Sequence, residues 1–205
     1  MRKKQKILRP TIEPQRWPAE SALATVRQLN ARCVALLAEQ PHADAVLSAL
    51  WGKVDSRVCE RAGRCPVLLI DLNFQRPEWW QRASQRRADP LLPEVAHTAQ
   101  AERAALLIRE ILMDALTIGR TTPRALNMIF GMAAPVTATL VQMGPAEIDR
   151  IALEEARHLK GRWLESRSFW KGLLEAAIGT DDQALANVHL HCLQLLGSEL
   201  VLTLN

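Results

Sequence analysis

Glycine and proline divide the stretch from Arg120 to Lys171 into short segments, and this division constrains the fold more than any other feature of the chain. Proline suits the first position of a helix, and glycine commonly follows the last one. Residues 159–165 alternate over a span too short for a helix, which predicts an exposed or edge strand. The stretch therefore predicts consecutive short helices and one strand. The prolines and glycines that set these breaks are, in order, Pro123, Gly131, Pro135, Gly144 and Pro145.

Short helices joined by Gly or Pro turns are the layout of helix-turn-helix DNA-binding units, and also of many plain helical bundles. The stretch has no helix rich in Arg, Asn and Gln that would read bases. DNA binding and simple helical packing therefore both remain open. The candidate base or phosphate contacts in this unit are Arg120, Arg124, Asn127 and Arg150.

The order of elements in the second half of the chain resembles a known family. Phe130–Gly131 is followed by an Ala/Thr/Leu-rich helix, the run Gly144–Ala152, a strand around Arg162–Trp163 and further helices, with Thr180–Asp182 before the last one. This order resembles the FlhD subunit of the bacterial flagellar master regulator, and the FlhD-like proteins of integrative conjugative elements and genomic islands. The resemblance covers roughly residues 100–203.

The resemblance implies a helical, dimerising subunit that is not an enzyme. Such a subunit works with a DNA-binding FlhC-type partner to recruit RNA polymerase and activate transcription. By this resemblance, the expected assembly is a homo- or hetero-oligomer, and a mobile genetic element is one expected source.

The same order of elements occurs twice. A long helix, short helices, a strand and an aromatic helix are expected at 20–83 and again at 96–177, so the chain is interpreted as a tandem pseudo-duplicate. Two such units could form an internal pseudo-dimer, and pairing of their strands would remove two exposed edges. The segments that correspond in this interpretation are Val54–Asp55 and Ile148–Asp149, 67–73 and 159–165, and Trp79–Trp80 and Phe169–Trp170.

The chain is therefore expected to be mainly α, with FlhD-like helical units and two short β-strands at 67–73 and 159–165. The predicted division is a basic flexible arm at 1–18, a first unit at 19–83, a linker at 84–95 and a second unit at 96–205. The residues predicted for the core, each on the apolar face of its segment, are Leu29, Val58, Leu69, Leu107, Ile111, Phe130, Leu140, Ile151, Trp163 and Leu193.

The N-terminal arm concentrates positive charge. Its prolines forbid a continuous helix, which is typical of a solvated tail. The same charges suit an arm that follows DNA phosphates and adds salt-dependent affinity without sequence preference. A net charge of +4 and a pI near 9.1 permit a nucleic-acid partner without demanding one. The cations of the arm are Arg2, Lys3, Lys4, Lys6 and Arg9.

Two pairs of large apolar residues are candidates for binding a partner protein. Trp79 and Trp80 lie beside several arginines, an arrangement that suits a nucleic-acid surface but is more often a core with arginines along its edge. The last helix carries leucines beyond one stripe, so Leu196 and Leu200 are expected on a face shared with another subunit.

No catalytic or metal-binding motif is present. The four cysteines form no CxxC pair, and Cys59 and Cys65 are six apart, which is not a usual zinc spacing. His189 and His191 are two apart on an expected helix and so point to different faces. The cysteines are expected to be small buried hydrophobes. Without a P-loop, GxSxG or HExxH sequence, no enzyme activity, metal or cofactor is expected.

No run of apolar residues approaches a membrane span, and no apolar region follows the basic N-terminus, so a cytoplasmic protein is expected. Two hypotheses for its function remain. The first is an FlhD-like transcriptional regulator subunit that binds DNA with an FlhC-like partner. The second is an α-helical interaction protein without DNA contact, for instance an assembly factor or chaperone of a secretion or conjugation system.

Overall fold

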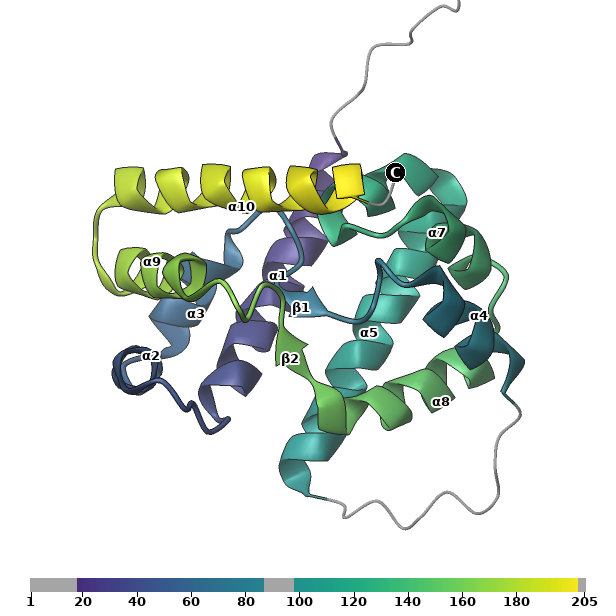
Figure 1. The fold of residues 1–205 in the computed structure, drawn as a ribbon, viewed down its shortest axis with the longest axis horizontal. Helices are drawn as coiled ribbons and strands as arrows, with labels where there is room; N and C mark the ends of the chain where they lie inside the picture. Colours follow the sequence, from purple (N-terminus) through teal and green to yellow (C-terminus); the bar gives the residue numbers. More distant parts are fainter. Residues whose placement is uncertain (1–17, 87–97, 203–205) are drawn as a thin grey trace, which may run out of the picture.

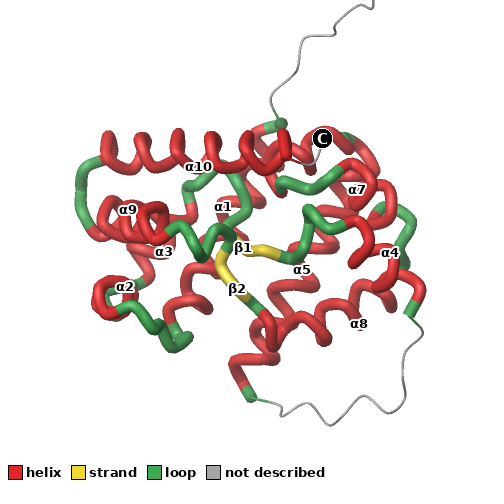
Figure 2. The backbone as a smooth tube through the Cα atoms, viewed as in Figure 1, coloured by secondary structure: helices red, strands yellow, loops and turns green. Residues whose placement is uncertain are grey.

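The computed structural model describes residues 18–86 and 98–202, and over these residues the protein is mainly helical, as the sequence predicts (Figures 1 and 2). The remainder consists of loops and one two-stranded sheet. The elements are α1 Glu20–Ala38, α2 Ala45–Trp51, α3 Ser56–Gly63, β1 Ile70–Asp71, α4 Pro77–Gln85, α5 Ala99–Thr121, α6 Pro123–Ala125, the π-helical turn η1 Leu126–Phe130, α7 Ala134–Leu140, α8 Pro145–Glu155, the 3-10 turn η2 Ala156–His158, β2 Lys160–Gly161, α9 Arg167–Ile178 and α10 Asp182–Leu202.

The two predicted strands exist and pair with each other in antiparallel orientation. Ile70 lies opposite Gly161, and Asp71 lies opposite Lys160. Each strand is only two residues long, much shorter than the predicted 67–73 and 159–165. Soon after each strand one residue has a positive φ, which turns the backbone out of the extended conformation. Asn73 has φ 56° and Trp163 has φ 53°.

The extended segment before β1 is held by a buried side chain and by two backbone hydrogen bonds, from Arg162 to the carbonyl of Leu69 and from Leu68 to the carbonyl of Ile129, both at 2.7 Å. Asn30 of α1 is fully buried, and its Nδ2 donates to the carbonyl oxygens of Cys65 and Val67 at 3.1 and 2.9 Å. Its Oδ1 accepts from the backbone N–H of Leu69 at 2.9 Å. Asn30 and these two backbone bonds together satisfy the buried polar groups of the segment.

The elements on either side of the sheet repeat at a nearly constant interval. Helices α2 and α7 start 89 positions apart, as do α3 and α8, and the starts of α4 and α9 are 90 apart. The predicted match of Trp79–Trp80 with Phe169–Trp170 has this spacing. The predicted match of Val54–Asp55 with Ile148–Asp149 is wrong. Asp55 is the residue that caps the start of α3, and the residue that caps the start of the equivalent helix α8 is Gly144, not Asp149.

The backbone hydrogen bonds of the two post-strand turns repeat. The amide of Arg76 donates to the carbonyl of Asn73 at 2.9 Å, and the amide of Ser166 donates to that of Trp163 at 2.8 Å. The equivalent tryptophans Trp80 and Trp170 also bond to carbonyls of these turns, but the two carbonyls differ by one position in the repeat. The Nε1 of Trp80 donates to the carbonyl of Asn73 at 3.1 Å, and that of Trp170 donates to the carbonyl of Arg162 at 2.8 Å. This agreement shows that the two halves have equivalent local structure around the strands.

The helix after each strand packs on the other half of the chain. Helix α4, from the first half, contacts α7, whereas α9, from the second half, contacts α2 and α3. Figure 1 shows α4 beside α7 and α8, and α9 beside α2 and α3, on opposite sides of the strand pair. The two halves therefore exchange helices: each strand leads into a helix that packs on the other half, and the two strands pair where the chain segments cross.

Two hydrophobic cores result from this exchange. One surrounds α5 and includes side chains of α1, α4, α7 and α8, and the other joins α1, α2 and α3 to α9 and α10. Neither core is confined to one of the predicted units 19–83 and 96–205. Most of the predicted core residues are buried, but Trp163 and Leu193 are only partly buried at the edge of the second core. The buried ones are Leu29, Val58, Leu69, Leu107, Ile111, Phe130, Leu140 and Ile151.

Candidate nucleic-acid interface at one end of the helices

The antiparallel packing of α1 and α5 puts the start of α1 and the arginines at the end of α5 at one end of the described structure. Two ion pairs set the direction: Arg32 of α1 binds Glu110, and Glu39, just after α1, binds Arg103 near the start of α5. The start of α1 therefore lies beside the end of α5. At a rise of about 1.5 Å per residue, Glu20 lies about 18 Å from Arg32 along α1. The last turn of α5 lies at a similar distance from Glu110, the partner of Arg32, so the two helix ends are at the same level. We call this the basic end.

Arg120 and Arg124 lie at the basic end and are exposed. Neither has an ion pair or a side-chain hydrogen bond to another residue in the described part of the chain. Arg120 occupies the last turn of α5, where a cation also compensates the helix dipole. The predicted basic arm, with Arg2, Lys3, Lys4, Lys6 and Arg9, lies outside the described residues, and α1, which follows it in sequence, starts at this end.

Two further arginines lie near α10. Arg27 of α1 pairs with Glu20 at 2.6 Å, whereas Arg64, just after α3, is exposed and has no ion pair among the described residues. Burial lowers the pKa of His189, and the positive charges of Arg27 and Arg64 lower it further. His189 is therefore neutral at pH 7 and does not add to the positive charge of this surface.

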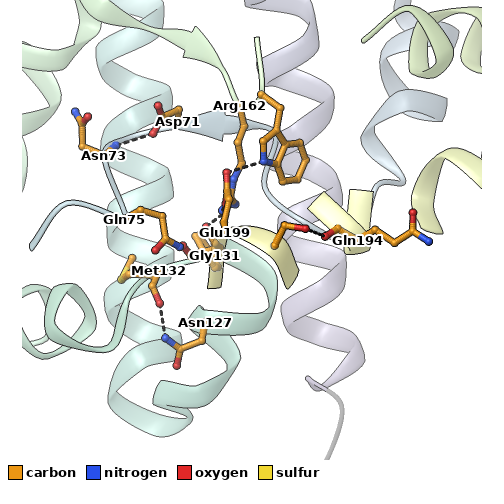
Figure 3. Close-up of polar contacts among 12 residues, drawn as sticks. Asp71, Asn73, Gln75, Asn127, Gly131, Met132, Arg162, Gln194 and Glu199 are labelled. Atoms are coloured by element: carbon orange, nitrogen blue, oxygen red, sulfur yellow. Dashed lines mark hydrogen bonds and ion pairs between the residues drawn. The ribbon is translucent and has the colours of Figure 1, made fainter. Parts of the chain in front are cut away.

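Two of the predicted DNA contacts, Asn127 and Arg150, bond to other groups within the protein, so their prediction as DNA contacts is wrong. The Nδ2 of Asn127 donates to the carbonyl of Met132 and closes the turn after η1 (Figure 3). Arg150 is buried, with an ion pair to Glu154 at 3.0 Å and a hydrogen bond to the carbonyl of Ala83 at 2.5 Å. Neither side chain is positioned to read a base.

The predicted partner-binding residues need the same correction. Trp80 is fully buried and Leu196 is 4% exposed, so neither lies on a surface in this structure. Trp79 is half-buried and packs edge to face on Trp80, with ring centroids 5.2 Å apart. Leu200 is half-buried at the edge of the second core. The tryptophan pair is thus mainly a core feature.

A polar crevice beside the strand pair was not predicted from the sequence. Arg162, which is 5% exposed, donates to the carbonyl of Phe130 at 2.9 Å and forms an ion pair with Glu199 of α10. The Nε1 of Trp163 donates to the other oxygen of Glu199 at 2.6 Å. Figure 3 shows Arg162 and Glu199 together with Gln75 at this point. The crevice encloses about 210 Å³.

The crevice is built mainly to hold elements together. Gln75 Nε2 donates to the carbonyl of Gly131, which secures the loop after β1 to the turn after η1. Asp71 accepts from the amide of Asn73 at 2.9 Å and pairs with Lys160 across the strands at 2.9 Å. Apart from the local bond between Asp71 and Asn73, these contacts are long-range in sequence, and Glu199 comes from α10. Residue patterns within one segment carry no signal for such a network.

No protein-family model, curated protein or solved structure matches this chain. The described residues contain no group of three or more His, Cys, Asp and Glu side chains placed to hold a metal ion. Among them there is also no helix with the length and apolar content that crossing a membrane requires.

Proposed function

We propose that the protein is an FlhD-like transcriptional regulator subunit that binds DNA together with an FlhC-like partner in the bacterial cytoplasm. One observation carries the proposal: antiparallel packing of α1 and α5 puts exposed Arg120 and Arg124 at the end where the basic N-terminal segment joins the fold. Cations collected from separate segments suit the phosphate backbone of DNA.

The need for a partner follows from what this surface lacks. Asn127 and Arg150 bond to backbone carbonyls, so among the predicted contacts that the structure describes only Arg120 and Arg124 remain, and arginines at a helix end suit phosphates. Phosphate contacts position a protein on DNA without specifying sequence. An FlhC-like subunit would therefore supply the sequence reading, and the resemblance to FlhD adds recruitment of RNA polymerase.

The test measures DNA affinity as a function of salt, with and without the product of a neighbouring FlhC-like gene. The protein alone should bind weakly and without sequence preference, whereas the pair should bind one promoter region tightly. Changing both Arg120 and Arg124 to Ala should reduce the slope of log affinity against log salt by about 2, since each phosphate contact contributes about 1. Deleting residues 1–9 should reduce the slope further at every sequence.

Arg157→Ala is the matched control. Arg157 is also exposed and has no ion pair among the described residues, but it lies at the opposite end, since Gln40 just after α1 donates to the carbonyl of nearby Leu159 at 3.1 Å. This variant should leave the salt slope unchanged. Equal effects of Arg157→Ala and the double variant would refute a localised interface. A specific footprint by the isolated protein at physiological salt would refute recognition delegated to a partner.

A second candidate function is a helical interaction protein without DNA contact. It is favoured by large apolar side chains on the surface: Leu106 of α5 is 63% exposed and Leu190 of α10 is 60% exposed. Leu106 borders a groove of about 230 Å³ between α1 and α5. The same titration separates the two functions, because an interaction protein shows no salt-dependent DNA affinity with or without its partner.

A further inference from the structure

Two buried cysteines from distant parts of the chain meet in the second core. Cys65 lies two positions after α3, and Cys192 lies in the middle of α10, 127 positions later. Their Sγ atoms are 3.0 Å apart, and the two residues are 1% and 0% exposed. The sequence suggests four unrelated buried thiols, so this pairing is a product of the fold.

We propose that Cys65 and Cys192 are a site of reversible covalent modification, and that they form a disulfide that locks α10 onto the segment between α3 and β1. A disulfide has an S–S length of about 2.05 Å, so closure requires the two sulfur atoms to approach by about 1 Å. Rotation of the side chains can supply a movement of this size without unfolding the helix.

The other two cysteines differ in ways that make them internal controls. Cys33 is fully buried in the first core, and Cys59 is half-buried on α3. Neither has a second sulfur atom within hydrogen-bonding distance in the described part of the chain. Only the Cys65–Cys192 pair is thus arranged to close a bond within one molecule.

While α10 is packed on the core, the two buried thiols react slowly, so we expect oxidation to require opening of α10. The hydrogen bond between the two sulfur atoms and then burial raise the pKa of the Cys192 thiol. The thiolate, not the thiol, is the nucleophile, and a buried protonated pair presents neither a thiolate nor access. When α10 lifts from the core, both thiols reach solvent and ionise more readily. The rate of oxidation then depends on how often α10 opens. Once formed, the disulfide holds α10 on the core.

Oxidised glutathione supplies the chemistry. One cysteine thiolate attacks a sulfur of glutathione disulfide, forming a mixed disulfide and releasing one glutathione thiolate. The second cysteine thiolate attacks the protein sulfur of the mixed disulfide and releases the second glutathione. The protein loses two electrons and two thiol protons in total, and glutathione disulfide is reduced to two thiols. Disulfides in a reducing compartment are usually transient, so the bond acts as a redox-dependent lock.

The experiment equilibrates the full chain in buffers of increasing oxidised-to-reduced glutathione ratio, followed by acid quenching. Peptide mapping without reductant should recover one peptide pair joined through Cys65 and Cys192, in a monomer. The free thiol count in denaturant should fall from four to two. The oxidised protein should melt at a higher temperature, because the bond closes a loop of 127 positions in the unfolded chain.

The variants Cys33→Ala and Cys59→Ala should both retain the linked peptide pair and the rise in melting temperature. Cys65→Ala and Cys192→Ala should each lose both, while a glutathione adduct remains on the unpaired cysteine. If these two variants do not fold, the wild-type peptide map still decides. Four free thiols at every ratio, glutathione only on Cys59, or disulfides only between molecules would each overturn the proposal.

Discussion

Two arginines at equivalent positions join the halves by the same kind of contact. Arg61 of α3 and Arg150 of α8 are 89 positions apart. The Nε of Arg61 donates to the carbonyl of Ala177 at 3.2 Å, and Arg150 donates to the carbonyl of Ala83. Both carbonyls lie near the end of a helix, where the C=O groups carry partial negative charge. Each arginine therefore fixes the end of the helix that comes from the other half.

At Gly131 the fold demands a residue without a side chain. Its φ is 62°, and a Cβ there would lie 1.9 Å from Arg162 Nη2, in the same place as the buried guanidinium. Gly131→Ala should therefore lower the free energy of unfolding by about 2–4 kcal/mol, from backbone strain and displacement of Arg162. Chemical denaturation at fixed pH measures this change.

Gly172→Ala provides the comparison for Gly131→Ala. Gly172 lies inside α9, where a Cβ would meet Val188 Cγ2 at an ordinary contact distance of 3.6 Å. Alanine inside a helix should raise stability by about 0.5–1 kcal/mol. A loss of similar size in both variants would show that the Arg162 contact is not what makes Gly131 necessary.

At the scale of elements, α10 has one buried face and one exposed face. Leu185, Cys192 and Leu196 are buried against the second core, whereas Leu190 is 60% exposed. The wide spread of leucines around this helix predicts burial on two sides, but this chain covers only one side in the described structure. The exposed side is the part of α10 that remains for a partner.

Aspartate substitutions separate these two faces. Leu196→Asp places a charge in an apolar core and should lower stability by at least about 3 kcal/mol. Leu190→Asp should change stability by less than about 0.5 kcal/mol, since its side chain is exposed. It should nevertheless weaken association with a partner, measured by sedimentation of the mixed proteins. Loss of stability in Leu190→Asp would mean that α10 is docked in another rotation.

The sequence predicts most helices because their signals are local. The Gly and Pro breaks place the starts of α7 and α8 within one residue of the predicted Pro135 and Pro145. The lengths of the strands are mispredicted because groups far away in sequence, the side chain of Asn30 and the carbonyl of Ile129, hold the segment before β1. Trp163, predicted for the core, is only partly buried.

The candidate interface is less predictable than the fold. Exposure of Arg120 and Arg124 follows from their place at a helix end, whereas the commitment of Arg150 depends on Ala83, 67 positions away. A polar side chain in a sequence shows no sign of whether its partner will be DNA or a distant carbonyl. The same reason hides the Arg162–Glu199 pair, which joins residues 37 positions apart.

At the scale of the molecule, the exchange of α4 and α9 makes each half depend on the other. Phe74, just before α4, lies 6.4 Å from Phe130 of the second half, measured between ring centroids. Trp170 of α9 lies 5.4 Å from Trp51 of the first half. Each strand also pairs one of its edges with the strand from the other half. Burial of the largest side chains therefore requires both halves at once.

This dependence predicts the behaviour of a chain divided between α4 and α5. Fragments 1–90 and 91–205 should each be poorly structured alone, because Trp80 and Trp170 would lose partners from the other fragment. Mixed in equal amounts, they should form a 1:1 complex with the helix content of the intact chain and one cooperative melting transition. Circular dichroism measures the helix content and the melting transition, and light scattering measures the mass of the complex.

Two variants of the second fragment test the role of the exchanged helix. Trp170→Ala should prevent the complex from forming, whereas exposed Leu153→Ala should not. If either fragment alone melts cooperatively with full helix content, the halves are independent domains joined by a linker, and the exchanged helices are not what holds the molecule together.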